Sequence, residues 1–397
     1  MGIGSMGITT KREKNQKSIF ISIITAVSIF SQLPIVYQSS ILSNFVTIVW
    51  LIFAFYSLLI NDCKIYLSFT LLLPFLFNVF CLFLSLTGGN YLTANLFRPI
   101  NLCAFIFEVG LIFGNVADED SILSFVKTFI VSSTIVGIII FLQYFMGRAI
   151  VTNGYNYNGK NSFACILLVS LILMLTFRIQ LFKSGRSVIL LLFLIAFYIY
   201  FLFIMKSRLT LLILLLFMVY YIFMGNLKFF WKFISLAIMI LLIFIVVGNE
   251  KLYDTIINTI ILNNKDVNDI NAITSNRLDQ FELFKELFPD VWAFGNGGYY
   301  LESFPLACLL SFGIFGSIFI FGFALVPLFI GIKGLIKNKN DILALAILLV
   351  SLSLLINGLG EELTPYGPGV KCFVMWFLSG VYLNYSKKKR NYAVVRY

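Results

Sequence analysis

Histidine is absent from the 397 residues of this chain, and charged residues make up only 12% of them. The first absence excludes histidine-based acid–base catalysis, histidine metal ligands and any Ser-His-Asp triad. The second excludes an ordinary soluble domain, which carries about 25% charged residues. Because 60% of the residues are hydrophobic, the chain cannot hide its apolar surface in its own core. Its main solvent is therefore lipid.

The six cysteines do not form a recognisable framework. They lie in or beside apolar runs, without the spacing of a disulfide-rich module or a metal site. We expect them to be small core residues. The net charge of +11 does not indicate nucleic-acid binding, because the cations are spread over short segments between apolar runs, as topology signals are.

Long apolar runs fill most of the chain. A helix that crosses a membrane needs about 20 mainly apolar residues. The sequence therefore predicts an all-α fold, a polytopic transmembrane helical bundle of about 12 spans that forms a single integral membrane domain over residues 1–397. The expected spans are 18–37, 41–60, 65–86, 98–117, 121–146, 162–177, 188–205, 207–224, 229–247, 303–332, 341–360 and 367–385.

The distribution of lysine and arginine predicts the orientation. Cytoplasmic loops of membrane proteins carry an excess of these residues. With a cytoplasmic N-terminus, ten of the 29 cations fall outside and 19 inside, and the C-terminus is cytoplasmic as well. The ten outer cations are Arg98, Arg148, Lys160, Lys206, Arg208, Lys251, Lys265, Arg277, Lys285 and Lys371.

The largest outer segment, 248–302, lies between the ninth and tenth spans. Its second part carries an apolar stripe at helical spacing, which predicts a short amphipathic helix on the outer membrane face. We expect this helix to begin after Asn276 and to end at Pro289. A tight turn with positive φ angles should follow at Gly295–Gly298. The stripe consists of Leu278, Phe281, Phe284 and Phe288.

Amides and tyrosines gather just before the sixth span. Amides bond sugar hydroxyls and aromatic faces stack on pyranose rings, so this stretch is a candidate for sugar recognition. The structural alternative is a turn of glycine and asparagine that caps the next helix. The candidate substrate-binding residues here are Asn156, Tyr157, Asn158, Lys160 and Asn161.

Two arginines at the outer boundary are candidates for binding phosphate, since a guanidinium presents a planar fork that matches it. The connection Lys206-Ser207-Arg208 is so short that Arg208 must lie at the boundary. Arg277 opens the loop helix, whose N-terminus itself favours anions. The alternatives are a snorkelling arginine at 208 and a solvated arginine at 277. Lys206 joins the substrate-binding candidates.

Four carboxylates complete the set of candidates. Glu302 lies where the loop re-enters the membrane, and partial desolvation there would raise its pKa and suit a general base; the alternative is an interfacial charge paired with a lysine. Glu361 and Glu362, in the last outer turn, are second-tier candidates for catalysis. The alternative is that both are simply solvated acids. Glu108 lies inside the fourth span, where we expect it to pair with an arginine.

Taken in this order and on the outer side of the membrane, these features resemble those of the O-antigen polymerase family of integral membrane glycosyltransferases. The resemblance covers about residues 150–320, and the earlier spans match only as generic membrane helices. The family has an Asn/Gly-rich stretch before a middle span, a Ser-Arg pair opening a later span, an Arg-led amphipathic segment running to a Gly-x-Gly turn, and a short polar motif entering a span with glycines. Here these are Asn156 to Phe163, Ser207-Arg208, Arg277 to Gly297, and Glu302-Ser303 followed by Gly313 and Gly316.

The resemblance implies a polymerase of surface polysaccharide, such as the O-antigen of lipopolysaccharide, in the bacterial inner (plasma) membrane. It would transfer a growing glycan from undecaprenyl diphosphate to a lipid-linked oligosaccharide repeat unit, without a metal or other cofactor. Arg208, Arg277 and Glu302 would carry the catalysis, and Gly295 and Gly297 would join the substrate-binding residues. The implied partners are the lipid-linked oligosaccharides, membrane lipid and a polysaccharide chain-length regulator.

Two alternative functions stay open. The related O-antigen ligases have a His-Asn pair where this chain has Glu302-Ser303, a difference that favours the polymerase. A lipid-linked oligosaccharide flippase also has about twelve spans. Transporters, however, place charges near the membrane midplane and are built from two similar halves, and neither feature is prominent here.

Overall fold

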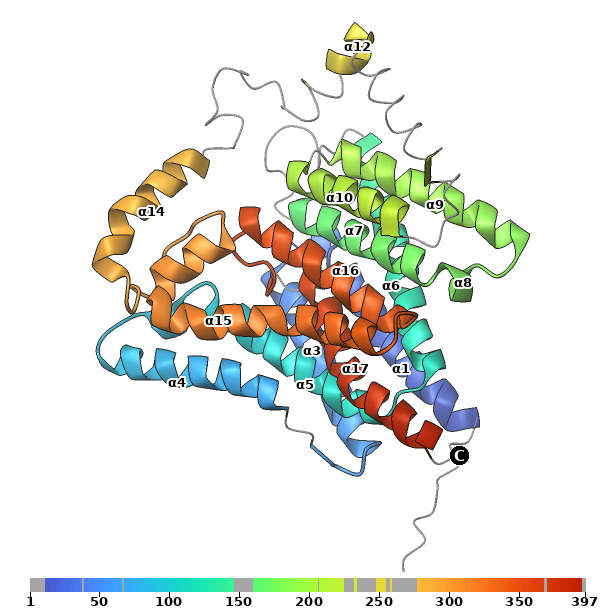
Figure 1. Cartoon of the computed structure of the whole chain (residues 1–397), viewed down its shortest axis with the longest axis horizontal. Helices are drawn as coiled ribbons and strands as arrows, with labels where there is room; N and C mark the ends of the chain where they lie inside the picture. The colour runs from blue at the N-terminus through green and yellow to red at the C-terminus, as the bar shows by residue number, and fades with distance from the viewer. Residues whose placement is uncertain are drawn as a thin grey trace, which may run out of the picture.

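The fold is all-helical, as predicted, with no strand in the part of the chain that the computed structural model describes (Figure 1). That part comprises residues 11–37, 39–65, 68–145, 160–205, 207–224, 232–233, 248–254, 258, 277–367 and 370–394. The α-helices are α1 (Lys11–Phe30), α2 (Pro34–Tyr37), α3 (Ser40–Leu59), α4 (Leu72–Leu86), α5 (Phe97–Val116), α6 (Glu119–Phe145), α7 (Lys160–Thr176), α8 (Arg178–Leu181), α9 (Gly185–Ile204), α10 (Arg208–Met224), α12 (Glu250–Tyr253), α14 (Arg277–Val291), α15 (Phe304–Lys337), α16 (Ile342–Asn357) and α17 (Val370–Val394). Short 3-10 helices are η1 (Phe69–Leu71), η2 (Tyr91–Thr93) and η4 (Gly358–Gly360).

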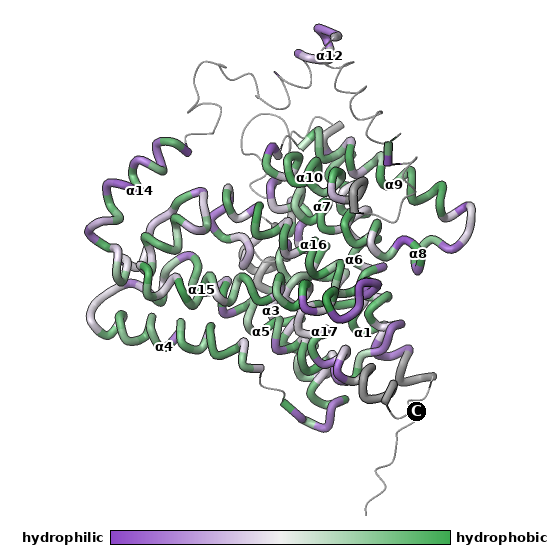
Figure 2. Tube along the Cα trace, viewed as in Figure 1, coloured by the Kyte–Doolittle hydropathy of each residue, from purple (hydrophilic) through white to green (hydrophobic). Residues whose placement is uncertain are grey.

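Eleven of the twelve predicted spans coincide with helices, and the ninth, 229–247, lies outside the described residues apart from 232–233. Within the described residues, six helices are long and apolar enough to cross a membrane. Figure 2 shows hydrophobic residues along the bundle helices, whereas α14 mixes hydrophobic and hydrophilic ones. The six apolar helices are consistent with a multi-pass membrane protein.

Helices α5 and α17 make the most extensive contact in the bundle. Gly110 of α5 faces Gly380 of α17, Gly114 faces Val381, and a Cβ atom at any of the three glycines would run into the backbone of the opposite helix. Membrane helices that approach so closely typically meet through small residues at four-residue spacing. These glycines therefore set the distance between the two central helices.

Amide side chains connect α5 to its other neighbours. Asn101 and Asn78 of α4 exchange two hydrogen bonds, with N–O distances of 2.6 and 3.0 Å. Asn115 donates to Asn61 at 2.6 Å. Polar groups among membrane helices need partners of this kind. Glu108 lies seven residues from each of these α5 asparagines, and therefore on the same helix face.

The expected ion pair between Glu108 and an arginine does not form among the described residues. Both of its carboxylate oxygens are buried, and neither has a hydrogen-bond partner in that part of the chain. The amides beside it on α5 already bond to asparagines of neighbouring elements. The structure therefore corrects this prediction: Glu108 is a buried carboxyl group without the counter-ion that we expected.

Helix α15 bends sharply at Gly313, where φ is 59° and ψ is −171°. Glycine adopts this φ without the steric cost that a side chain brings. The rings of Phe304 and Phe321 have centroids 5.7 Å apart, so residues 304–312 fold back along the longer part of the helix. The predicted span 303–332 is therefore interrupted by a bend, with a short first part before Gly313 and a longer part after it.

The loop before α15 fills the gap that this bend opens. In a membrane the backbone groups freed at a bend need new partners, and the loop supplies them. Gly295 and Gly297 have φ values of 72° and 84°, as expected for this turn, and a Cβ atom on either would crowd neighbouring backbone. The hydrogen bonds run from the backbone N of Asn296 to Leu310, Gly297 to Ser311, Ile314 to Trp292 and Phe315 to Ala293, with N–O distances between 2.8 and 3.2 Å.

The connections gather at two ends of the bundle (Figure 1). At the first, which we call the site end, Arg277 of α14 bonds to Gly360, and Asn95 before α5 bonds to Glu362 after α16. At the second, which we call the opposite end, the hydroxyl of Tyr382 in α17 donates to Asp341 before α16 at 2.8 Å.

Candidate active site

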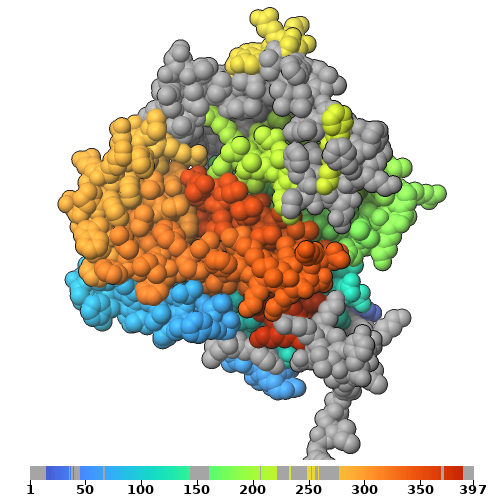
Figure 3. Space-filling view, viewed as in Figure 1, coloured from blue at the N-terminus to red at the C-terminus, as the bar shows by residue number. Residues whose placement is uncertain are grey.

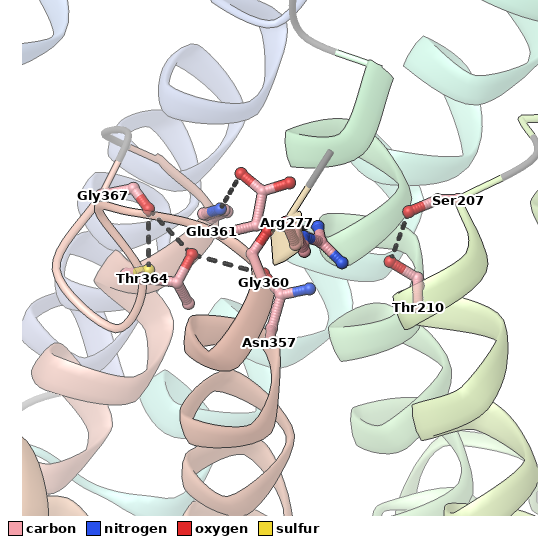
Figure 4. A network of polar contacts seen from close by, with 10 residues as sticks. Ser207, Thr210, Arg277, Asn357, Gly360, Glu361, Thr364 and Gly367 are labelled. Atoms are coloured by element: carbon pink, nitrogen blue, oxygen red, sulfur yellow. Dashed lines mark hydrogen bonds and ion pairs between the residues drawn. The ribbon is translucent and has the colours of Figure 1, made fainter. Parts of the chain in front are cut away.

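Arg277, the first residue of α14, is held by the turn that follows α16. Its Nη2 donates to the carbonyl oxygen of Gly360 at 2.8 Å. Figure 4 shows Arg277 at this turn, with the start of α10 beside it. A Cβ atom on Gly360 would lie only 2.8 Å from Leu209 Cδ2 and 2.9 Å from Arg277 Nη2. A side chain at 360 would therefore require Leu209 and Arg277 to shift.

Glu302 faces the same guanidinium from the loop before α15. Its Oε2 lies 3.8 Å from Nε of Arg277, and its backbone N donates to Oε1 of Gln280 at 2.7 Å. The side chains are 40% exposed for Arg277 and 39% for Glu302, so a ligand can reach the pair. An ion pair this exposed contributes only about 0–1 kcal/mol. The contact between the two side chains is therefore weak, and Nε of Arg277 is buried without a hydrogen-bond partner among the described residues.

Arg208 brings a second cation to this place. It is the first residue of α10, and the next residue, Leu209, lies against Gly360 together with Arg277. The buried hydroxyls of Ser207 and Thr210 share a hydrogen bond of 2.9 Å beside it. Two neighbouring cations repel each other, and an anion placed between them relieves the repulsion. The N-terminus of α10 adds its own partial positive charge beside the two arginines.

Two more carboxylates lie in the turn after Gly360. Glu361 forms an ion pair with the buried Lys371 of α17, with Oε2 and Nζ 3.9 Å apart. Glu362 is only 6% exposed, and its Oε1 accepts a hydrogen bond of 3.3 Å from Asn95. Burial raises the pKa of Glu362 to about 7, although the hydrogen bond from Asn95 opposes this shift. Burial therefore favours the protonated form of Glu362 relative to a solvated glutamate.

The turn 361–367 is anchored from several directions. Tyr366 donates through its hydroxyl to the carbonyl of Ile320 at 2.6 Å, and Trp376 donates to the carbonyl of Pro365 at 3.0 Å. The rings of Tyr366 and Trp376 stack with centroids 5.3 Å apart. Thr364 bonds to Asn357 and to the carbonyl of residue 367, each at 3.3 Å (Figure 4). This turn is a rigid base for the groups that bond to it.

The structure describes only the end of the amide-rich stretch before the sixth span. Asn156, Tyr157, Asn158 and Lys206 lie outside the described residues, so their expected role in binding sugar stays a prediction. Lys160 begins α7, and Asn161 follows as an exposed residue. One turn later, Cys165 lies close enough to Lys371 and Glu361 for both charges to act on it. Asn161 is therefore at the site end.

Gly295 and Gly297 were expected to bind substrate, and their observed contacts are with the protein itself. Gly297 is buried, and the backbones of 292–297 are bonded to the bend of α15.

One Asp-x-Asp sequence of the type that can bind Mg²⁺ occurs, at Asp118–Asp120. It precedes and opens α6 at the opposite end, away from Arg277. Within the described part, no three metal-binding side chains gather.

Four residues of this site were not singled out from the sequence. Gly360 accepts a hydrogen bond from Arg277, and Gln280 accepts one from the backbone N of Glu302. Asn95 donates a hydrogen bond to Glu362, and Lys371 forms an ion pair with Glu361. Lys371 carried a signal that sequence reasoning could have used, because a lysine beside an apolar run and near two acids in the chain is a natural ion-pair partner. The other three depend on contacts between segments distant in sequence, which no local pattern reveals.

The chain matches no protein-family model, and no curated protein matches it. Its function must therefore be argued from the chemistry of the site.

Proposed function

We propose that this chain is a polysaccharide polymerase of the bacterial inner membrane that transfers a growing glycan from undecaprenyl diphosphate to a lipid-linked repeat unit. The observation that carries the proposal is that Arg277, Glu302 and the start of α10, which bears Arg208, lie together at one end of an apolar helical bundle. Two cations suit a diphosphate, and a carboxylate beside them suits the proton of an attacking hydroxyl. The resemblance of residues 150–320 to O-antigen polymerases supports the same chemistry.

In the proposed reaction the acceptor hydroxyl attacks the anomeric carbon of the donor glycan. The new carbon–oxygen bond forms while the bond from that carbon to the lipid diphosphate breaks, and the electron pair leaves with the diphosphate. Arg208 and Arg277 stabilise the charge that develops on this leaving group. Glu302 takes the proton of the hydroxyl. In this proposal the sugar is held by Tyr157 and by the amides from Asn156 to Asn161.

The contact between Arg277 and Glu302 links donor binding to the position of the base. In the proposed complex a diphosphate takes the place of Glu302 on the guanidinium of Arg277. The released carboxylate can then face the acceptor hydroxyl.

The proposed arrangement in the membrane has twelve spans, with the site end outside and both termini in the cytoplasm. It rests on the excess of lysine and arginine at the other end. Reporter fusions at Lys265 and at the C-terminus should give opposite signals for location. Identical signals would contradict the orientation and would separate the site from a substrate delivered to the outer face.

The test of function is glycan analysis of a strain that lacks this gene. Loss of a polymerase leaves the lipid core bearing a single repeat, whereas loss of a flippase or a ligase leaves no repeat. Complementation with the wild-type chain should restore long polymer. Complementation with Arg277→Ala should leave the single repeat, with normal amounts of the protein in the membrane. A core without any repeat in the deletion strain would reject the polymerase proposal.

A further inference from the structure

A cavity of about 790 Å³ lies at the opposite end of the bundle. Its volume is in the range of small-molecule sites, about 300–1,000 Å³. Apolar side chains such as Ile122, Phe177 and Ile330 form part of its wall, and three lysines line it as well. None of the residues of the candidate active site lines this cavity, so that site does not explain it.

The charges around the cavity are unequal. Lys333, Lys337 and Lys387 line it together with two acids, Glu119 and Asp341. Asp341 is already engaged inside the protein, because its Oδ1 accepts from the backbone N of Ala344 at 3.1 Å and its Oδ2 from Tyr382 at 2.8 Å. The three lysines therefore outnumber the two acids in the lining, and they are the groups that an acidic headgroup would meet.

The apolar part of the cavity reaches the side of the bundle that faces lipid. Phe329 lines the cavity and is 60% exposed, and Ile336, two turns later on α15, is 77% exposed. Large apolar side chains that stay exposed on a long apolar helix are in contact with lipid chains. Lys333 and Lys337 lie near the C-terminal end of the same helix, where the membrane meets water.

We propose that this cavity binds an anionic phospholipid of the cytoplasmic leaflet. Its acyl chains would lie along Phe329 and the apolar wall, and its phosphate would lie at Lys333 and Lys387. The positive-inside rule puts this end of the bundle on the cytoplasmic side, where the leaflet is rich in acidic lipid, and basic pockets between membrane helices bind acidic headgroups there. The site is separate from the proposed catalytic one and does not depend on it.

The test is a lipid titration of the full chain in detergent, with occupancy read by native mass spectrometry. Dioleoylphosphatidylglycerol should bind at least about tenfold more tightly than dioleoylphosphatidylcholine, because each lysine near the headgroup favours acidic lipid. The double variant Lys333→Gln/Lys387→Gln should lose this preference. Both lysines are exposed, so the variant should fold like the wild type. Equal binding of the two lipids by the wild-type chain would overturn the proposal.

A matched control is Lys64→Gln/Lys183→Gln, which removes two exposed lysines that do not line the cavity. It should keep the preference, and an equal loss there would mean that general surface charge attracts the lipid, against the proposal. Phe329→Ala tests the apolar wall without changing charge and should weaken lipid binding a few-fold. If it has no effect and inorganic phosphate competes with the lipid, the cavity is an anion site only, and the assignment to a phospholipid is wrong.

Discussion

The two halves of the candidate active site differ in how firmly the bundle holds them. The turn 358–367 is packed between α15 and α17, and Glu362 and Tyr366 in it are buried. Helix α14, by contrast, has no buried residue and rests on α15 as an outer layer (Figure 3). Arg277 joins the two halves through its bond to Gly360.

This difference suits the lipid-linked substrate that we propose, which is bulky. Catalytic groups act best when held in place before the substrate arrives, and the buried turn provides such a fixed base. A substrate needs an accessible surface, and Arg277 and Glu302, each about 40% exposed, provide it. We infer that the turn positions the site while α14 and the loop before α15 receive the ligand.

The strongest test of this comparison concerns Glu302 and Glu362, because either half of the site could supply the general base. Glu302→Gln, in the accessible half, should lower the rate of polymerisation by about 10²- to 10⁴-fold, the usual cost of removing a general base. Glutamine keeps the size and a hydrogen bond but cannot take up the proton. The same change at Glu362, in the buried half, should leave most of the activity. The measurement is the rate of polymer formation from lipid-linked repeats in vesicles.

The pH dependence separates the two carboxylates independently. Burial raises the pKa of Glu362 from its usual 4.5 to about 7, so the stability that this shift contributes is present below about pH 4.5 and is lost as the pH rises through about 7. Glu362→Gln should therefore raise the melting temperature relative to wild type at pH 8 more than at pH 5. If Glu362→Gln instead abolishes turnover, and wild-type activity rises with pH through about 7, the base lies in the buried half.

Removing Arg277 breaks the link between the halves. Arg277→Ala should reduce the rate by about 10²- to 10³-fold, the typical loss when one donor to a developing negative charge is removed. Arg208→Ala should have a similar effect. Lysine at either position should restore activity only in part, because it lacks the planar fork. Wild-type polymer from either alanine variant, with equal protein in the membrane, would remove that arginine from the mechanism.

What the sequence revealed of this site follows from the range of the interactions involved. The apolar runs, the stripe on α14 and the positive φ angles at Gly295 and Gly297 are local properties, and each appears where it was expected. The bend at Gly313 was not foreseen, because it depends on the loop 292–297 filling the gap. The helix also continues through Pro289 to Val291, so the predicted end was two residues early.

The wrong expectation for Glu108 has a different origin. Charges inside membrane spans usually find a partner, and this general rule led us to expect an arginine. The structure satisfies the other polar residues of that helix face with asparagines, at Asn78 and Asn61. A sequence does not specify which helices become neighbours, and therefore it does not specify which polar groups meet.

The contact between Arg277 and Gly360 can be loosened without removing a charge. Gly360→Ala places a Cβ atom within 3.0 Å of Arg277 Nη2 and Leu209 Cδ2, both mobile ends of side chains, and the backbone there does not require glycine. We expect a normal fold and a rate lowered by about tenfold, less than one lost donor costs. Gly185→Ala, where a Cβ atom meets nothing within 4 Å, is the control. Equal rates for the two variants would mean that the turn does not position Arg277.

The smallest expected effect concerns Glu108, which belongs to neither half of the site. A polymerase that works at the outer face has no use for a buried carboxyl group in α5, so Glu108→Gln should polymerise at nearly the wild-type rate. A transporter would give the opposite result, because ionisable groups within membrane helices commonly couple transport to protons. The measurement is polymer formation in vesicles, with and without a pH gradient, for wild type and Glu108→Gln. The amide Asn101→Ala, on the same helix face, controls for helix packing, since it removes the bonds to Asn78 and leaves the carboxyl group in place. If Glu108→Gln alone stops the appearance of lipid-linked repeats at the outer face, the chain is a flippase and the two arginines bind the diphosphate as cargo.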